Sequence, residues 1–260
     1  MKNKQKILLI VVVCLALALD TLWSRVGTQG VPILAYHQVT SEIVDDEDEM
    51  HYSVSPEEFA EQLNYLKNKG YQSVSLHDVF EAREGRAQLP AKPIVLTFDD
   101  GYKDNYTVAL PIMEQYGFSG TVFIIVNSVG ESEYLSWDEI RAMQQRHTEI
   151  GSHTLNHVSL RDTPLPEKRQ EIAESKQLIE NQIGQRVEFF AYPYGSYDQE
   201  SFSLLRSAGY RGACAGIAGY NLPGDNLPYR LKRVNIPRPR FGLLEFKLRL
   251  WRALLVSPFA

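Results

Sequence analysis

The sequence has 260 residues, of which 44% are apolar, so it is long enough to bury a sizeable core as one large α/β domain. The formal net charge of −5 hides an asymmetry, because the chain from Arg206 onward holds ten Lys/Arg against two Asp/Glu. No basic stripe interleaved with aromatic residues appears, which argues against a nucleic-acid binder. We therefore expect a single catalytic or binding domain with no nucleic-acid partner.

Residues 1–26 have the pattern of an export signal. Lys2, Lys4 and Lys6 precede an uninterrupted apolar run of thirteen residues, 7–19. This run is short for a membrane span, which needs about 20 residues, whereas a charged start followed by a short apolar stretch is typical of a signal peptide. We predict a signal peptide or an N-terminal membrane anchor over 1–26, and an extracytoplasmic domain, secreted or membrane-anchored in the bacterial cell envelope, over 27–260.

Strand and helix patterns alternate along the rest of the chain. Residues 92–98 are β-branched and apolar without alternation, which is typical of a strand covered on both faces in a parallel sheet. The predicted strands cover 31–37, 71–76, 92–98, 120–126, 148–151, 189–191 and 210–215. The predicted helices start at Pro56 and end by Gly70, and then cover 76–82, 106–116, 137–145, 167–183 and 199–208. This order predicts an α/β fold with a (β/α) barrel, distorted or incomplete, as a single catalytic domain.

Polar side chains follow several of these strands at the point where each strand ends. In β/α barrels the groups that act on a ligand collect at this rim, because side chains from different strands converge there. The groups in question are His37, Asp99, Asp100, His153, His157 and the segment Tyr192-Pro193-Tyr194-Gly195. A set of unrelated surface residues would have no reason to share one rim.

One carboxylate and two imidazoles make a three-ligand set for a hydrolytic metal ion, most simply zinc, with cobalt or nickel as alternatives. Two consecutive acids at a strand end point in different directions, so one can bind the metal while the other acts as a base. Spacing alone does not decide which acid has which role. His153 and His157 are four residues apart, and we expect them to lie on one side of a helical turn.

These motifs resemble those of the polysaccharide deacetylases with NodB homology, carbohydrate esterase family 4. The run Thr97-Phe98-Asp99-Asp100-Gly101-Tyr102 resembles the first motif of the family, and Ser152-His153-Thr154-Leu155-Asn156-His157 resembles the second. The resemblance implies that Asp99 is the catalytic base and that Asp100, His153 and His157 hold the metal. It also implies hydrolytic removal of acetate from a polysaccharide.

The sequence departs from the family pattern at two places. Ala191 stands where the third motif has an arginine, so whatever orients the base must come from elsewhere. The late Leu-x-His motif has no counterpart, whereas His37 follows an early strand. That order is similar to the poly-β-1,6-N-acetylglucosamine deacetylases of biofilm systems, in which an early histidine is implied as the general acid. A hydrogen-bonded structural histidine is the alternative for His37.

We expect Tyr102, Trp137, Tyr192, Pro193 and Tyr194 to contact the sugar, although Tyr102, Trp137 and Tyr194 could instead be core residues. Near the C-terminus, a helical stripe beside basic residues predicts either a contact with an anionic membrane or packing against the barrel. It consists of Leu244, Leu248, Trp251 and Leu255. The remaining alternatives for function are a deacetylase of peptidoglycan, chitin-like oligomers or acetylated xylan, and a non-catalytic glycan-binding protein on the same scaffold.

Overall fold

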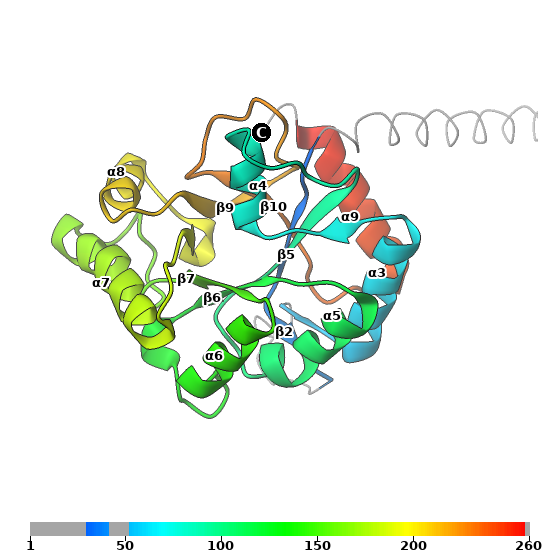
Figure 1. Ribbon diagram of the computed structural model, residues 1–260, viewed down its shortest axis with the longest axis horizontal. Coiled ribbons are helices and arrows are strands. Elements are labelled where there is room, and N and C mark those ends of the chain that lie inside the picture. Colours follow the sequence, from blue (N-terminus) through cyan, green and yellow to red (C-terminus); the bar gives the residue numbers. More distant parts are fainter. Residues whose placement is uncertain (1–29, 42–51, 258–260) are drawn as a thin grey trace, which may run out of the picture.

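The computed structural model describes residues 30–41 and 52–257, and within them the chain forms a closed parallel β-barrel surrounded by helices (Figure 1). The barrel closes because β1 pairs with β10 on one side and with β5 on the other. All its strand pairs are parallel, so all the strands end at the same rim. In order around the barrel the strands are β1 (Ile33–Tyr36), β10 (Leu231–Asn235), β9 (Gly212–Ala218), β8 (Phe189–Ala191), β7 (Glu149–Ser152), β6 (Thr121–Ile124) and β5 (Pro93–Phe98).

Helices cover the outside of the barrel. They are α3 (Pro56–Asn68), α4 (Leu76–Arg83), α5 (Leu110–Tyr116), α6 (Trp137–Gln145), α7 (Leu165–Ile183), α8 (Gln199–Ser207) and α9 (Gly242–Val256). A π-helical turn, η1 (Asn105–Ala109), leads into α5, and two 3₁₀ turns, η2 (Val126–Ser128) and η3 (Pro193–Gly195), follow β6 and β8. The short β4 (Gln72–Ser73) lies beside the start of β5, and β2 (Gln38–Val39) pairs with β3 (Ser53–Val54) in a separate small sheet.

Local sequence signals explain where four of the helices begin. A side-chain oxygen accepts from the third backbone N–H of the helix, and the third residue bonds back to the cap, which satisfies two otherwise unpaired donors. These capping boxes start at Ser55 for α3, Ser75 for α4, Ser136 for α6 and Asp198 for α8. In α3 the cap is followed by Pro56, whose fixed φ suits the first helical position.

Side chains along each strand alternate between the barrel interior and the helical layer. On β5, Leu96 and Phe98 pack in the cluster that includes the surrounding helices, whereas Val95 packs in the inner cluster. The alternation continues past the strand end, so Asp99 follows Val95 and Thr97 on the inner side. The same alternation puts His37 on the inner side after Ile33, and Arg233 on the inner side after Leu231.

The interior is filled at the end where the strands start. Helix α4 contributes Phe80, whose ring lies 5.0 Å from that of Phe189. On β7, Gly151 leaves room for Phe123, because a Cβ at that position would come within 2.4 Å of the phenyl ring. The barrel is therefore a packed core rather than a pore, and a ligand can approach the inner residues only from the other rim.

The predicted (β/α) barrel is confirmed, with seven closing strands in place of the eight of a complete (β/α)₈ barrel. Several details differ from expectation, among them the small sheet of β2 and β3, which was not predicted, and the strand predicted over 71–76, of which only Gln72–Ser73 forms. Strand β10 was not predicted, because Leu231-Lys232-Arg233-Val234-Asn235 lacks the continuous apolar run of the other strands. Residues 210–211 precede β9, which extends to Ala218. His153 and His157 lie on a loop after β7 and not on a helical turn.

The predicted signal peptide or anchor over 1–26 lies outside the described residues. Within residues 30–41 and 52–257, none of the helices combines the length and the apolar character that a membrane crossing requires.

Candidate active site

Two inner side chains at the rim form a buried ion pair. Arg233 on β10 donates from Nη1 to Asp99 Oδ1 and from Nη2 to Asp99 Oδ2, each at 2.7 Å. Both side chains are buried. Burial alone would raise the pKa of the Asp99 carboxyl, but the Arg233 guanidinium, with help from His153, holds this pKa well below its usual value. Asp99 is therefore ionised, and the two parallel hydrogen bonds fix its orientation.

Asp100, His153 and His157 converge on one point beside this pair. The Nε2 atoms of both histidines lie 3.3 Å from Asp100 Oδ1. One ligand atom from each of the three residues lies within 4.8 Å of the other two. Asp100 Oδ1 is buried and has no hydrogen-bond donor among the described residues. The site therefore offers two imidazole nitrogens and one carboxylate oxygen that accepts no hydrogen bond from the described part of the chain. This set of ligand atoms fits a divalent cation.

The hydrogen bonds around His153 favour the tautomer that a metal ligand needs. The Nδ1 atom of His153 lies 2.7 Å from the carbonyl oxygen of Ala191, which can only accept a proton. Nδ1 therefore carries the hydrogen and donates it, which leaves the Nε2 lone pair directed toward Asp100. The backbone carbonyl of Ala191 thus takes part in the site, although this residue replaces the arginine of the family motif.

Glu171 on α7 holds the loop that carries both histidines. Its carboxylate accepts from the backbone N–H groups of Leu155 at 2.8 Å and Asn156 at 3.0 Å, and from the Asn156 side chain at 2.6 Å. Within this loop Thr154 and His157 have positive φ angles of 70° and 58°. Asp100 also has a positive φ, of 74°. Non-glycine residues adopt this conformation at a cost, and such strain is concentrated at functional sites.

The two histidines differ in their charge environment. Burial lowers the pKa of His157 to about 4, so this imidazole is neutral at neutral pH and can ligate. Burial would also lower the pKa of His153, but the neighbouring carboxylates Asp100 and Asp99 outweigh it, and the pKa is raised. A bound cation would compete with that proton, since a histidine ligates only when neutral.

His37 lies at the same rim, directly after β1. Burial lowers its pKa, while the negative charges of Asp99 and Asp100 act in the opposite direction. Its Nδ1 atom is buried and has no hydrogen-bond partner among the described residues, so the structure offers no satisfied structural role for that nitrogen. The ring packs against Tyr52 with centroids 4.7 Å apart.

The expected sugar contacts fall into two groups. Tyr194 is exposed, and its ring centroid lies 4.7 Å from that of His157, so it borders the site. Tyr102 stacks on Tyr134 at 5.1 Å. In contrast, Tyr192 is buried and its hydroxyl donates to the carbonyl oxygen of Tyr229, so its side chain is a core residue and not a sugar contact.

Pro193 is also buried, which leaves it a role in shaping the turn rather than touching a ligand. Trp137 is partly buried and packs against the core at the start of α6, as the alternative reading of that residue predicted.

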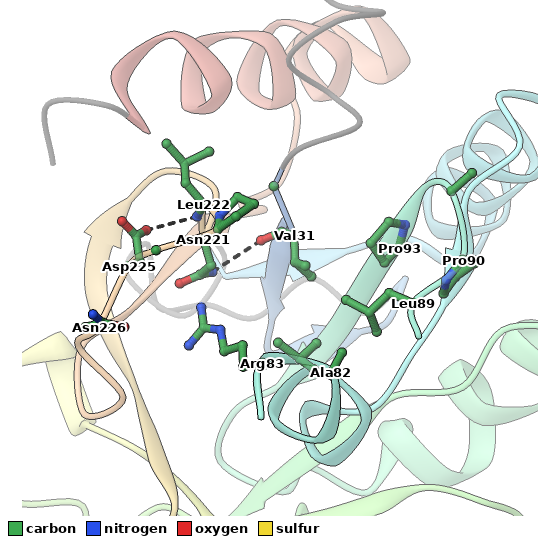
Figure 2. A pocket seen from close by; sticks show the side chains of 15 residues that line it. Val31, Ala82, Arg83, Leu89, Pro90, Pro93, Asn221, Leu222, Asp225 and Asn226 are labelled. Atoms are coloured by element: carbon green, nitrogen blue, oxygen red, sulfur yellow. Dashed lines mark hydrogen bonds between the residues drawn. The ribbon is translucent and has the colours of Figure 1, made fainter. Parts of the chain in front are cut away.

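A cavity of about 600 Å³ lies away from these groups, between α4, the start of β5 and the loop that precedes β10 (Figure 2). Figure 2 shows Arg83, Leu89, Asn221 and Asp225 around it, with Asn221 bonded to Val31. Because Val31 and Pro93 stand where their strands begin, this cavity is at the opposite end of the barrel from Asp99 and Asp100. It is not part of the candidate active site.

Sequence reasoning missed two residues of the site. Arg233 is 134 positions from Asp99, and only the barrel closure between β10, β1 and β5 brings the two together. The signal available was the missing arginine at Ala191, which required a substitute but did not locate it. Glu171 is on a long polar helix, and nothing in the sequence distinguishes its buried carboxylate from the exposed acidic residues of that helix.

Comparisons with known proteins agree with this geometry. Residues 86–213 match the family model described as polysaccharide deacetylase. The chain is 30% identical over 181 residues to "Putative polysaccharide deacetylase YxkH" of Bacillus subtilis, with 70% of this chain and 62% of that protein covered. It is 31% identical over 144 residues to the poly-β-1,6-N-acetyl-D-glucosamine N-deacetylase of Escherichia coli, covering 49% of this chain and 21% of that protein.

Among solved structures, the deacetylase PplD of Streptococcus pyogenes, in complex with acetate, superimposes with a TM-score of 0.76 at 26% identity. That match covers 85% of this chain and 98% of PplD. The fold and the site thus define a β/α-barrel protein, and residues 86–213 resemble the domain of the polysaccharide deacetylases with NodB homology. The chain spans less than two thirds of the length of the curated relatives named above.

Proposed function

We propose that this protein is a metal-dependent N-deacetylase of an extracytoplasmic N-acetylglucosamine polysaccharide. The observation that carries the proposal is that a candidate base and a candidate metal site lie side by side at one rim. An ionised carboxylate, Asp99, is held by Arg233 beside a convergent set of three metal-ligating groups. Hydrolysis of an amide at neutral pH needs both an activated water and a base to take its proton.

The three-ligand set of Asp100, His153 and His157 would hold the cation, with zinc as the first candidate and cobalt or nickel as alternatives. When bound there, a divalent ion would lower the pKa of a water ligand and polarise the acetamide carbonyl. Asp99 accepts the proton of the attacking water, since it is ionised and cannot rotate away from Arg233. Arg233 itself positions the base and does not touch the reacting atoms.

The developing oxyanion requires a hydrogen-bond donor from the protein. In the turn after β8, the backbone N–H of Tyr192 donates to Cys214 and that of Gly195 donates to Tyr192, while Pro193 has none. Tyr194 has the remaining backbone N–H of this turn, which is the proposed oxyanion donor. His37, on the inner side of the rim near both aspartates, is the proposed acid that protonates the leaving amine.

Poly-β-1,6-N-acetylglucosamine is the proposed substrate. The support is the similarity to the Escherichia coli enzyme of that name, together with the early position of His37 in place of a late histidine motif. Removal of acetate would convert neutral sugar units to amines, which gain positive charge. A deacetylase of peptidoglycan, chitin-like oligomers or acetylated xylan would keep the same metal residues and differ in the residues that contact the polymer.

A non-catalytic glycan-binding protein is the alternative from a different class. The Asp99–Arg233 pair speaks against it, because taking two charges out of water is costly and binding a neutral sugar requires no such pair. The sequence pattern of residues 1–26 supports an extracytoplasmic location, either after signal cleavage or with the segment retained as a membrane anchor.

The test is acetate release from a panel of polymers: poly-β-1,6-N-acetylglucosamine, chitin oligomers, peptidoglycan and acetylated xylan. Metal-free protein is assayed with zinc, cobalt or nickel added. We expect release from the β-1,6-linked polymer in preference to the others. Binding of that polymer without acetate release under any metal would favour the glycan-binding alternative, and preferential release from another polymer would reassign the substrate.

A further inference from the structure

Helix α9 has two apolar faces, and only one of them packs on the barrel. Phe246, Leu250, Ala253 and Leu254 are buried, and Phe246 contacts Tyr65 of α3 with ring centroids 6.2 Å apart. A second stripe is exposed: Phe241 by 75%, Leu244 by 60%, Leu248 by 53% and Leu255 by 38%. The stripe repeats at intervals of three, four and seven residues, so it runs straight along the side of the helix opposite the buried face.

Cationic side chains border the exposed stripe. Lys247 and Arg252 are exposed on α9, one along each edge of the stripe, and Arg240 is exposed just before the helix begins. Neither Arg240 nor Arg252 has a carboxylate side chain as an ion-pair partner in the described part of the chain. An apolar band with cations along its edges is complementary to a lipid surface, whose acyl region accepts the leucines while anionic headgroups pair with the cations.

The first described residue, Gly30, lies near one end of this helix. Tyr220 donates its backbone N–H to Ser257 Oγ at 2.7 Å, directly after α9. On the other side, a Cβ on Gly30 would lie 3.2 Å from the Cβ of Tyr220. Gly30 and the end of α9 thus meet at Tyr220. The apolar run 7–19 is separated from Gly30 by residues 20–29, which can reach at most about 36 Å when extended.

We infer that the exposed stripe of α9 lies on an anionic bilayer surface. A second copy of this chain is a poorer occupant, because a two-fold contact through the stripe would bring its bordering cations face to face. The orientation leaves the active site open. Helix α9 starts after the end of β10 at the rim and runs along the outside of the barrel (Figure 1). With the stripe on the bilayer, the rim would therefore open beside the membrane plane rather than into it.

The test uses the full chain with Cys14 replaced by Ser and one new cysteine carrying the environment-sensitive fluorophore NBD. Cys214 is buried and does not compete for the label. The reporter position is Leu248→Cys, and the matched control is Leu178→Cys on α7, which is 42% exposed and lies outside the stripe. Each protein is mixed with vesicles of phosphatidylcholine alone or with added phosphatidylglycerol.

We expect a blue shift of the label at position 248 with vesicles that contain phosphatidylglycerol, and none at position 178. Reversing the charge at Arg240→Glu and Arg252→Glu should abolish the shift at position 248 even when the protein still sediments with the vesicles through its N-terminal segment. The inference fails if position 248 shows no shift on anionic vesicles, or if the shift is equally large on neutral ones. A shift that grows with protein concentration in the absence of lipid would instead assign the stripe to a second copy. Acetate release from a soluble oligomer should be the same in all these variants, so this outcome is independent of the proposed activity.

Discussion

Replacing Arg233 by Met tests how the base is held. The substitution keeps an unbranched chain of similar volume but removes both hydrogen bonds to Asp99, which leaves a buried carboxylate without a partner. Breaking a buried ion pair in this way costs about 3–5 kcal/mol of folding free energy. Arg230→Met, in the loop before β10, is the matched control, and we expect it to change the free energy of unfolding by no more than about 0.5 kcal/mol.

The pH dependence of the variant follows from the sign of the shift. In the native protein the pKa of Asp99 lies below its unfolded value of about 3.9, so the pair adds stability above that pH and loses it as the pH falls. Without Arg233, burial is the largest influence that remains, and it raises the pKa of Asp99. The acidic limb of the pH profile of kcat/KM should therefore move upward, because a protonated Asp99 cannot act as the base.

Urea denaturation and acetate release are measured for Arg233→Met, Asp99→Asn and the double variant. The double variant should be more stable than Arg233→Met, because it no longer buries an unpaired charge. Arg233 does not hold the base if Arg233→Met unfolds at the same urea concentration as the wild type and keeps the acidic limb of its kcat/KM profile. The same conclusion follows if the effects of the two substitutions on the free energy of unfolding are simply additive.

Four further predictions concern the site and the barrel. Asp99→Asn should lose about 10²-fold or more in turnover yet bind zinc with unchanged affinity, and loss of zinc by calorimetry would mean that the roles of the two aspartates are exchanged. His37→Ala should lose about 10²–10⁴-fold in kcat while retaining the metal, and an ordinary rate would remove His37 from the mechanism. Glu171→Gln should weaken zinc binding by about 10–100-fold, because one of its three accepted hydrogen bonds is lost, whereas Glu174→Gln on the same helix should have no effect. Gly151→Ala should lower the free energy of unfolding, measured by urea denaturation, by about 1–3 kcal/mol, because its Cβ meets Phe123. Gly184→Ala is the control and should cost less, because nothing lies within 4 Å of its Cβ and only the left-handed backbone is strained. Equal costs would contradict the close packing at Gly151.

The sequence was sufficient for the barrel and for the convergence of the candidate ligands. Buried strands without alternation predict a parallel sheet, and parallel strands end together, so residues as distant as His37, Asp100 and His153 were expected at one rim. The structure places them there.

The details that the sequence could not provide depend on long-range closure and on backbone conformation. Arg233 reaches Asp99 because β10 pairs with β1, which pairs with β5, and no local pattern encodes that order. The two histidines converge through a loop in which Thr154 and His157 have positive φ, a conformation that residue types of this kind rarely signal. Tyr192 was misjudged because a buried tyrosine and a sugar-stacking tyrosine look alike in a sequence.

Metal titration coupled to an activity assay is the sharpest test of whether Asp100, His153 and His157 hold a catalytic cation. Metal-free wild-type protein and the variants Asp100→Asn, His153→Ala and His157→Ala are titrated with zinc, and acetate released from poly-β-1,6-N-acetylglucosamine is measured at each step. The account predicts that wild-type activity rises with zinc and saturates at one ion per chain, and that each variant loses both the tight binding and the activity. Acetate release that is independent of any divalent ion, or tight zinc binding that survives in all three variants, would contradict it.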